Sequence, residues 1–127
     1  MPELQHLGRT RTARVVILPA EITIGNARRL RERLAAGARP GVTAVIADMT
    51  ATVVCDGEGA FSLAQAHQQS AARGVELRLA VPSAEVRRVF PILGLELLVH
   101  LCPSVEAALA PAPAPAPLPP GSQTGGG

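Results

Sequence analysis

The stretch "TAVIADMTATVVCDGEGAFSL", from Thr43 to Leu63, joins an apolar run to an acidic, glycine-rich turn and to the first residues of a helix. Residues 43–48 are largely apolar, which is typical of a strand that is buried on both faces of a parallel sheet. Residues 52–55 extend the connection or form a brief strand end. The stretch therefore predicts a strand, a turn at residues 56–59 (the acidic turn) and a helix, in that order.

The helix after the acidic turn is expected from about Gly59 to Arg73, where Gly74 would end it. One face of this helix is apolar at helical spacing and comprises Ala60, Leu63, Ala64, His67 and Ala71. His67 lies five residues after Ser62, on another face, and no third residue is placed to orient it as a catalytic base. We therefore expect His67 to pack in the core.

Two strands and a helix are expected before this unit. The β-branched run at residues 12–18 predicts a strand that Pro19 ends, and residues 4–7 form a weaker strand before it. Asn26 is the expected N-cap of a helix over residues 27–37, "ARRLRERLAAG". The arginines of this helix are expected to form a solvated face opposite its apolar residues.

The chain after Gly74 continues the alternation of strands and helices. Residues 75–81 alternate apolar and polar side chains, which predicts a half-buried strand. Ser83 is expected to cap a helix over residues 84–93, which Pro91 should kink or shorten. The run "LLVHL", residues 97–101, predicts a last short strand, and residues 104–110 predict a last helix.

This alternation indicates βαβ units and hence an α/β fold. We expect one small domain at residues 1–110, with its core at about residues 13–110. A mostly parallel sheet of about four to five strands would be covered by about four helices. The remaining segment, residues 111–127, reads "PAPAPAPLPPGSQTGGG" and is expected to be a disordered tail.

Charge and composition argue against several classes of function. The twelve basic residues are all arginine and stand against ten acids, so the net charge of +2 is too small to favour a nucleic-acid partner. Phe61 and Phe90 are the only aromatic residues, which leaves little for base stacking. Asp56, Glu58 and the distant Asp48 are too few ligands for a metal site. We therefore expect neither a metal nor another cofactor.

The sequence also bears on compartment and redox state. The N-terminus, "MPELQHLGRT", does not read as a secretory signal, and no segment approaches the roughly 20 apolar residues of a membrane helix. We expect a cytoplasmic protein without membrane insertion. Cys55 and Cys102 lie far apart in no metal-ligand spacing, and are expected to be free thiols buried as small hydrophobic groups.

Two interpretations of the acidic turn stay open. In the first, Asp56 is the N-cap of the following helix and Glu58 is an acid in its first turn, contributions of about 1 and about 0.3–1 kcal/mol. In the second, the turn contacts a partner and Glu58 supplies a permanent negative charge. Two glycines, Gly57 and Gly59, indicate either a close backbone approach or an exposed, mobile turn.

Taken in order, these segments resemble STAS domains (sulphate transporter and anti-sigma factor antagonist). "PAEITIGNARRLRERL" is similar to the family's G-E-[LI]-D segment and first helix, and "AVIADMT" to its central strand. "CDGEG" falls on the family's D-S-[ST]-G motif. "PSAEVRRVFPILGL" and the later "PSVEAAL" resemble the family's C-terminal pattern. The resemblance covers about residues 13–110.

The resemblance implies a stand-alone, non-catalytic regulator that an anti-sigma factor with kinase activity phosphorylates on the first Ser of D-S-[ST]-G. Asp56 matches the motif's Asp and Gly59 its Gly. Gly57 stands in place of the phosphorylated Ser, and Glu58 in place of the second Ser/Thr. Gly57 cannot accept a phosphate, so the phosphorylation site is degenerate. Thr23 stands where the family has an earlier Asp.

We therefore expect a protein–protein contact with an anti-sigma factor of the serine kinase type, or with another signalling protein. The expected binding residues are Asp56, Gly57, Glu58, Gly59 and Ser62, with Glu21, Thr23, Asn26, Arg87 and Arg88 as further candidates. Thr50, Thr52 and Ser62 are candidate substitute phosphorylation sites. The alternative is a STAS accessory subunit of a transporter, or a scaffold module in a signalling assembly.

Overall fold

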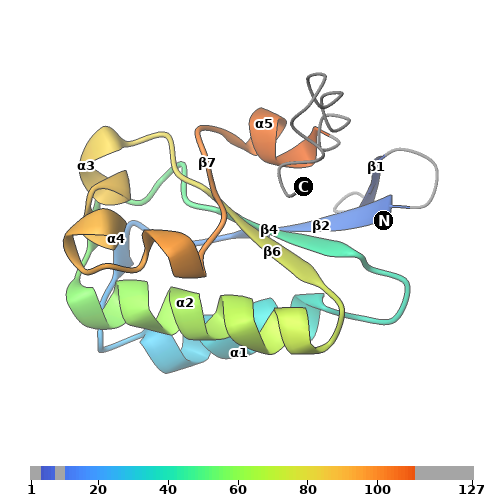
Figure 1. Cartoon of the computed structure of the whole chain (residues 1–127), viewed down its shortest axis with the longest axis horizontal. Helices are drawn as coiled ribbons and strands as arrows, with labels where there is room; N and C mark the ends of the chain where they lie inside the picture. The colour runs from blue at the N-terminus through green and yellow to red at the C-terminus, as the bar shows by residue number, and fades with distance from the viewer. Residues whose placement is uncertain (1–3, 8–10, 111–127) are drawn as a thin grey trace, which may run out of the picture.

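A five-stranded sheet forms the centre of the protein in a computed structural model that describes residues 4–7 and 11–110 (Figure 1). In spatial order the strands are β1 (Leu4–Leu7), β2 (Arg11–Ile17), β4 (Ala44–Asp48), β6 (Glu76–Ala80) and β7 (Leu101–Cys102). β1 pairs with β2 in the antiparallel sense, and the other pairings are parallel. The expected α/β fold with a mostly parallel sheet is confirmed.

β4 is the central strand, and this position accounts for its composition. It pairs with β2 on one side and with β6 on the other, and its first four residues have no exposed surface. A strand with neighbours on both sides and layers on both faces is expected to carry mostly apolar side chains before its end. Asp48, the last residue of β4, is the first that is partly exposed.

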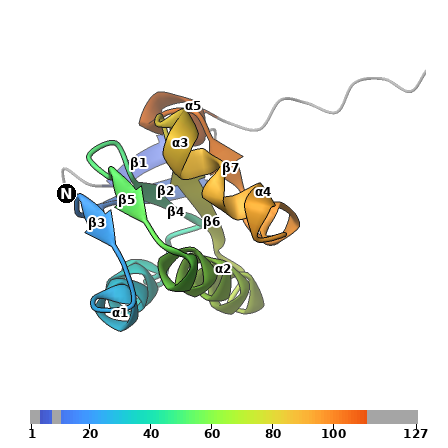
Figure 2. The same ribbon diagram turned by 90° about the vertical axis from the view of Figure 1, so that its left-hand side faces the viewer.

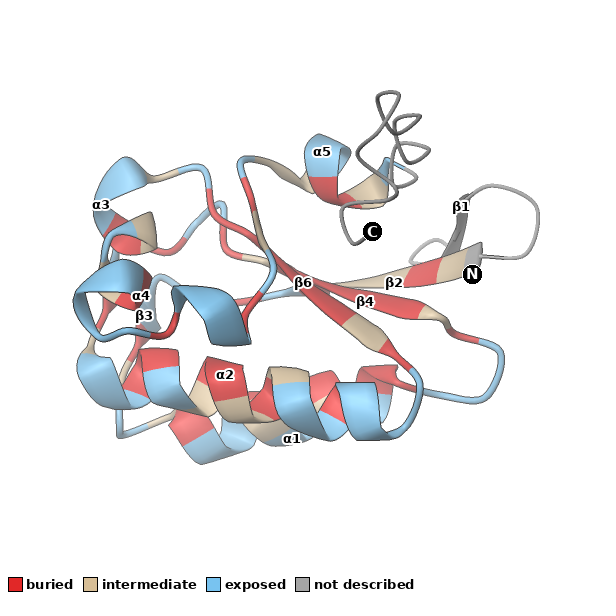
Figure 3. Cartoon of the chain, in the orientation of Figure 1, coloured by how far each residue is buried: buried red, intermediate tan, exposed pale blue. Residues whose placement is uncertain are grey.

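Helices cover the two faces of the sheet unequally. α1 (Ala27–Gly37) and α2 (Gly57–Ala72) pack on one face over the larger hydrophobic core, and α5 (Val105–Leu109) lies on the other face over a smaller one (Figures 1 and 3). α3 (Ala84–Arg87) and α4 (Val89–Ile92) lie at the end of the sheet where the parallel strands finish. This end carries the acidic turn.

A second, two-stranded sheet lies beside the same end. β3 (Glu21–Ile22) and β5 (Val54–Cys55) pair in parallel, so the segments before α1 and before α2 run side by side (Figure 2). The sequence indicated a brief strand near residue 55, but it did not indicate its partner. Pairing two residues of each segment fixes the starts of α1 and α2 relative to each other.

The expectation that residues 75–81 form a half-buried strand is wrong. β6 is buried on both faces, because α5 covers the face that carries Arg78, which is only 3% exposed. The guanidinium of Arg78 donates to the carbonyl oxygens of Ala108 and Ala110, and also to Glu76 Oε1 at 2.9 Å. A cation at the C-terminal end of α5 satisfies the last carbonyls of that helix and complements its dipole.

The helix expected over residues 84–93 is divided into α3 and α4. Ser83 caps α3 as expected, since its hydroxyl accepts the Val86 N–H at 3.2 Å. Pro91 has no N–H to donate to the carbonyl of Arg87, where α3 ends, and the chain resumes as α4 after a turn at Arg88. The shortening predicted from Pro91 is confirmed.

Two other expected elements have different limits. Instead of a strand over residues 97–101, the chain forms a 3-10 turn, η1 (Glu96–Leu98), and only Leu101–Cys102 pairs with β6.

α2 begins at Gly57 rather than near Gly59. Its buried face extends to Ala66 and Ser70, whereas Ala71 is exposed. The face is wider than one stripe because α2 packs against α1 as well as against the sheet. The tail predicted at residues 111–127 lies outside the described residues.

Replacing Arg78 with Ala should lower the free energy of unfolding by about 3 kcal/mol, because the C-terminal carbonyls of α5 would lose a buried charged donor. Urea unfolding followed by circular dichroism measures this change. The control is Arg73→Ala, at the exposed C-terminal end of α2, which should stay within about 0.5 kcal/mol of the wild type. Equal stability of the two variants would contradict the role assigned to Arg78.

Candidate functional site

The acidic turn is held by Asp56, which binds two separate segments of the chain. Its Oδ1 accepts the N–H of Gly59 at 2.7 Å, which makes Asp56 the N-cap of α2. Its Oδ2 accepts the N–H of Ile24 at 3.4 Å, from the loop between β3 and α1. The capping interpretation is therefore confirmed, and the same carboxylate also joins the turn to the neighbouring loop.

The two glycines of the acidic turn differ in what surrounds them. A Cβ on Gly59 would lie 2.5 Å from the carbonyl oxygen of Ile22, a backbone atom that cannot move aside easily. Gly57 is exposed, and a Cβ there would only meet Leu93 Cδ1 at 3.6 Å, an ordinary contact. The close approach predicted from the glycines therefore applies to Gly59, whereas the fold has room for a side chain at position 57.

The loop before α1, residues 23–26, is organised by hydrogen bonds of its own. Asn26 Nδ2 donates to the Glu21 carbonyl at 2.7 Å, and Asn26 Oδ1 accepts the Thr23 N–H at 2.9 Å. Asn26 occupies the N-cap position of α1, but its side chain makes no capping bond to the helix, so that part of the prediction is wrong. The amide is already used within the loop, which it fixes before α1 begins.

An apolar surface cavity of about 490 Å³ lies against the acidic turn. Its lining consists of Asp56, Gly57, Glu58, Phe61, Leu93 and Leu95. Other large apolar side chains among the described residues are also exposed. They include Ile24, Val53 before β5, Ile92, and Leu97 and Leu98 of η1. A surface that combines a charged turn with exposed apolar side chains is typical of a protein contact. We call this cavity the turn cavity.

The structure separates the predicted binding residues into groups. Asp56, Gly57 and Glu58 line the turn cavity, whereas Ser62, Arg87 and Arg88 do not. The guanidinium of Arg87 donates to the carbonyls of Val81 and Pro82, which ties α3 to the end of β6. Arg88 is exposed.

Of the substitute phosphorylation sites, Thr52 is excluded by its environment. Its side chain is 1% exposed, and its hydroxyl donates to the Pro19 carbonyl at 2.8 Å. Thr50 is exposed and Ser62 is half-buried, so those two hydroxyls stay candidates.

The apolar half of the turn cavity was missed by sequence reasoning. Phe61 was noted only for its rarity, although its place off the apolar stripe of α2 is a signal that it faces outward. Leu93 comes from beyond α4, and nothing in its local sequence indicates that it would meet the acidic turn. This part of the site arises from the break at Arg88, which turns α4 toward α2.

Burial shifts the pKa values of three side chains, Cys55, His67 and Cys102, toward their uncharged forms. Burial and, after it, the neighbouring Asp56 carboxylate raise the pKa of the Cys55 thiol to about 11. Burial also raises the pKa of Cys102, and it lowers the pKa of His67, which is half-buried rather than fully packed in the core. Both cysteines are free thiols, as expected.

Within residues 4–7 and 11–110, no cluster of three His, Cys, Asp or Glu side chains could hold a metal ion. No helix of these residues is long and apolar enough to cross a membrane.

The sequence profile of the STAS domain matches residues 2–108. The chain belongs to the STAS domain family. No curated protein matches it significantly.

Solved structures with this fold include an anti-sigma factor antagonist and an anion transporter. The Bacillus cell fate determinant SpoIIAA in its phosphorylated form is 21% identical over 83% of this chain and 94% of that one, with a TM-score of 0.53. The unphosphorylated form of the anti-sigma factor antagonist SpoIIAA is 20% identical over 83% of this chain and 92% of that one, with a TM-score of 0.59. The murine anion transporter Slc26a9 is 17% identical over 84% of this chain but only 21% of its own, with a TM-score of 0.60. At these identities the likeness supports the fold.

Gly59→Ala should destabilise the protein by about 1–3 kcal/mol, because the added methyl group would overlap the Ile22 carbonyl. Gly57→Ala is the matched control: it adds the same group two residues earlier, in open contact, and should stay within about 1 kcal/mol of the wild type. Chemical denaturation measures both. If the two variants unfold at the same denaturant concentration, the close approach at Gly59 is not a constraint.

The Cys55 thiol should react slowly with iodoacetamide in the folded protein. With a pKa of about 11, only about one thiol in a thousand is ionised at pH 8, and the side chain is 8% exposed. The rate should keep rising between pH 9 and about 11, as measured by mass spectrometry of the Cys55 peptide. A rate that levels off near pH 9 would show that neither burial nor Asp56 perturbs this thiol.

Proposed function

We propose that this protein is a non-catalytic, cytoplasmic regulator that binds an anti-sigma factor of the serine kinase type, or a related signalling protein, through the acidic turn and the turn cavity. The observation that carries the proposal is the exposed acidic turn at the start of α2, fixed by Asp56 and bordered by the apolar surface of Phe61 and Leu93. It is supported by the STAS family match and by the likeness to an anti-sigma factor antagonist.

The turn has the properties that a recognition surface requires. Its backbone is fixed before any partner arrives, because Asp56 bonds both Gly59 and Ile24. A surface that is already ordered loses less conformational entropy on binding. Phe61 is half-exposed next to this turn, and aromatic side chains that enter a partner's pocket commonly contribute most to affinity.

In this protein Gly57 would have lost the phosphorylation site, and the Glu58 carboxylate would supply a permanent negative charge beside it. Gly57 has no oxygen to accept a phosphoryl group, and Glu58 is exposed in the first turn of α2. One carboxylate at a helix N-terminus is compatible with the helix dipole, although it carries less charge than a phosphate. Glu58 would then bias the protein toward a single binding state.

A second function is favoured by the fold shared with the transporter Slc26a9. In that case the chain would be an accessory subunit of a transport complex, or a scaffold module, and the same turn would contact a permease or ATPase. Affinity capture from the native cell separates the two. Recovery of a serine kinase supports the first proposal, and recovery of transporter subunits replaces it.

Glu58→Ala should change the affinity for the captured partner, and Phe61→Ala should weaken it by about tenfold or more, as measured by calorimetry. The matched control is Glu85→Ala, which removes an exposed acid from the first turn of α3, outside the turn cavity. If the Glu58 and Phe61 variants bind like the control, the turn only caps α2.

Incubation with the captured kinase and ATP should leave the wild-type protein without phosphate, whereas Gly57→Ser should be phosphorylated at position 57, because the fold has room for that side chain. Mass spectrometry locates the phosphate. Phosphate on Thr50 or Ser62 of the wild type would overturn the proposal that this domain has lost its switch.

A further inference from the structure

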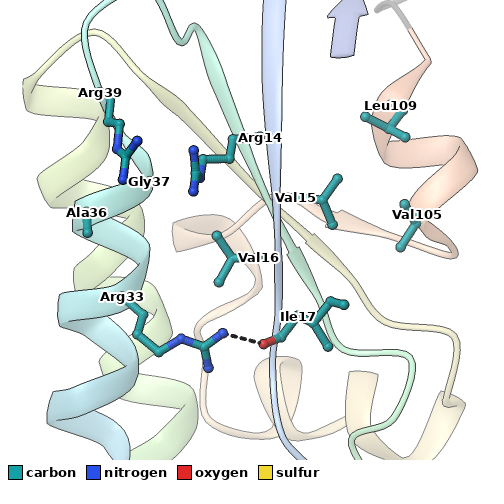
Figure 4. Close-up of a pocket in the computed structure, with 10 residues that line it drawn as sticks. All are labelled: Arg14, Val15, Val16, Ile17, Arg33, Ala36, Gly37, Arg39, Val105 and Leu109. Carbon is teal, nitrogen blue, oxygen red and sulfur yellow. Dashed lines mark hydrogen bonds between the residues drawn. The ribbon is translucent and has the colours of Figure 1, made fainter. Parts of the chain in front are cut away.

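A second cavity, of about 530 Å³, lies along the edge of β2 between α1 and α5 (Figure 4). None of its lining residues lines the turn cavity. Its walls come from three elements that are far apart in the sequence: the second half of β2, the C-terminal half of α1 and one face of α5. We call it the edge cavity.

The edge cavity lies beside the part of β2 that follows its pairing with β1. β1 pairs only with Arg11–Arg14, so from Val15 to Ile17 the described part of the chain has β4 on one side of β2 and no strand on the other. The Ile17 side chain is 64% exposed at this edge. A strand edge left open between two helices forms a groove with an apolar floor.

Among the described residues, the charged side chains that line the edge cavity are all arginines: Arg14, Arg33 and Arg39. Arg33 Nη2 donates to the Ile17 carbonyl at 2.8 Å, so its guanidinium is held across the open edge of β2 (Figure 4). The arginines of α1 were expected to form a solvated face, but Arg33 also borders this cavity, as does Arg39 just after the helix.

The apolar part of the cavity is contributed mainly by Val15 and Val16 of β2 and by Val105 and Leu109 of α5. Figure 4 shows the α5 side chains on one side of β2, and Arg33 of α1 and Arg39 on the other. A bound molecule would therefore meet apolar side chains at one end and guanidinium groups at the other. The volume lies within the range of small-molecule sites in proteins.

We propose that the edge cavity binds a small amphipathic anion, a carboxylate or phosphate ester carried on an apolar body. Guanidinium groups bind these oxyanions through paired, charge-assisted hydrogen bonds, and a fixed Arg33 loses little freedom in doing so. A second copy of the chain is a poor occupant, because its own β2 edge would place the same arginines against these. This site is independent of the function proposed for the acidic turn.

Calorimetry with octyl phosphate, octanoate and uncharged octanol tests the proposal on the full chain. Octyl phosphate should bind about tenfold more tightly than octanol, the order expected for one charge-assisted hydrogen bond. The variant pair Ile17→Glu and Ile17→Gln differs only in charge at the exposed mouth of the cavity. Ile17→Glu should weaken octyl phosphate binding about tenfold relative to Ile17→Gln.

A second pair of variants tests the arginines directly. Arg39→Gln should weaken octyl phosphate binding, whereas Arg28→Gln, at an exposed position of α1 outside the cavity, should not. Equal affinity for octyl phosphate and octanol, or equal losses in Arg39→Gln and Arg28→Gln, would overturn the proposal. So would binding to phosphatidylglycerol vesicles without binding to free octyl phosphate, since the ligand would then be a membrane surface.

Discussion

The arrangement at the acidic end of the sheet depends on how closely α2 approaches β3. The carbonyl of Ile22 accepts the Asp56 N–H at 3.1 Å, and the same oxygen faces the Cα of Gly59 with no room for a side chain between them. With α2 held there, the Asp56 carboxylate reaches both the helix and the Ile24 backbone. A methyl group at Gly59 would separate these partners and with them the two segments that form the site.

Much of the fold could be predicted from local sequence because burial imposes simple patterns on strands and helices. The central strand is apolar over most of its length since it has neighbours on every side, and the caps at Asp56 and Ser83 act within one helical turn. Burial of Arg78 could not be predicted in this way. The alternation of residues in β6 predicts that only one face of the strand is covered. The helix that covers the other face, α5, comes about thirty residues later in the chain, so the local sequence does not indicate it.

The candidate site also has one part that local sequence predicts and one part that depends on tertiary packing. Its polar half could be predicted because Asp56, Gly57 and Glu58 are consecutive in the sequence, and they line one cavity as expected. Its apolar half brings Phe61 of α2 and Leu93 from beyond α4 to the same cavity, an arrangement made by tertiary packing. The different requirements of Gly57 and Gly59 are equally invisible in the sequence, since both are glycines in one turn, and only the neighbouring backbone distinguishes them.

The contacts of Arg78 have a mechanical consequence. α5 is only five residues long, and its last carbonyls are hydrogen-bonded to a side chain rooted in β6, a strand with hydrogen-bonded neighbours on both sides. Tension applied to the chain beyond Ala110 would therefore pass through the guanidinium into the middle of the sheet before it could peel the short helix away. Arg78 therefore resists separation of α5 from the sheet.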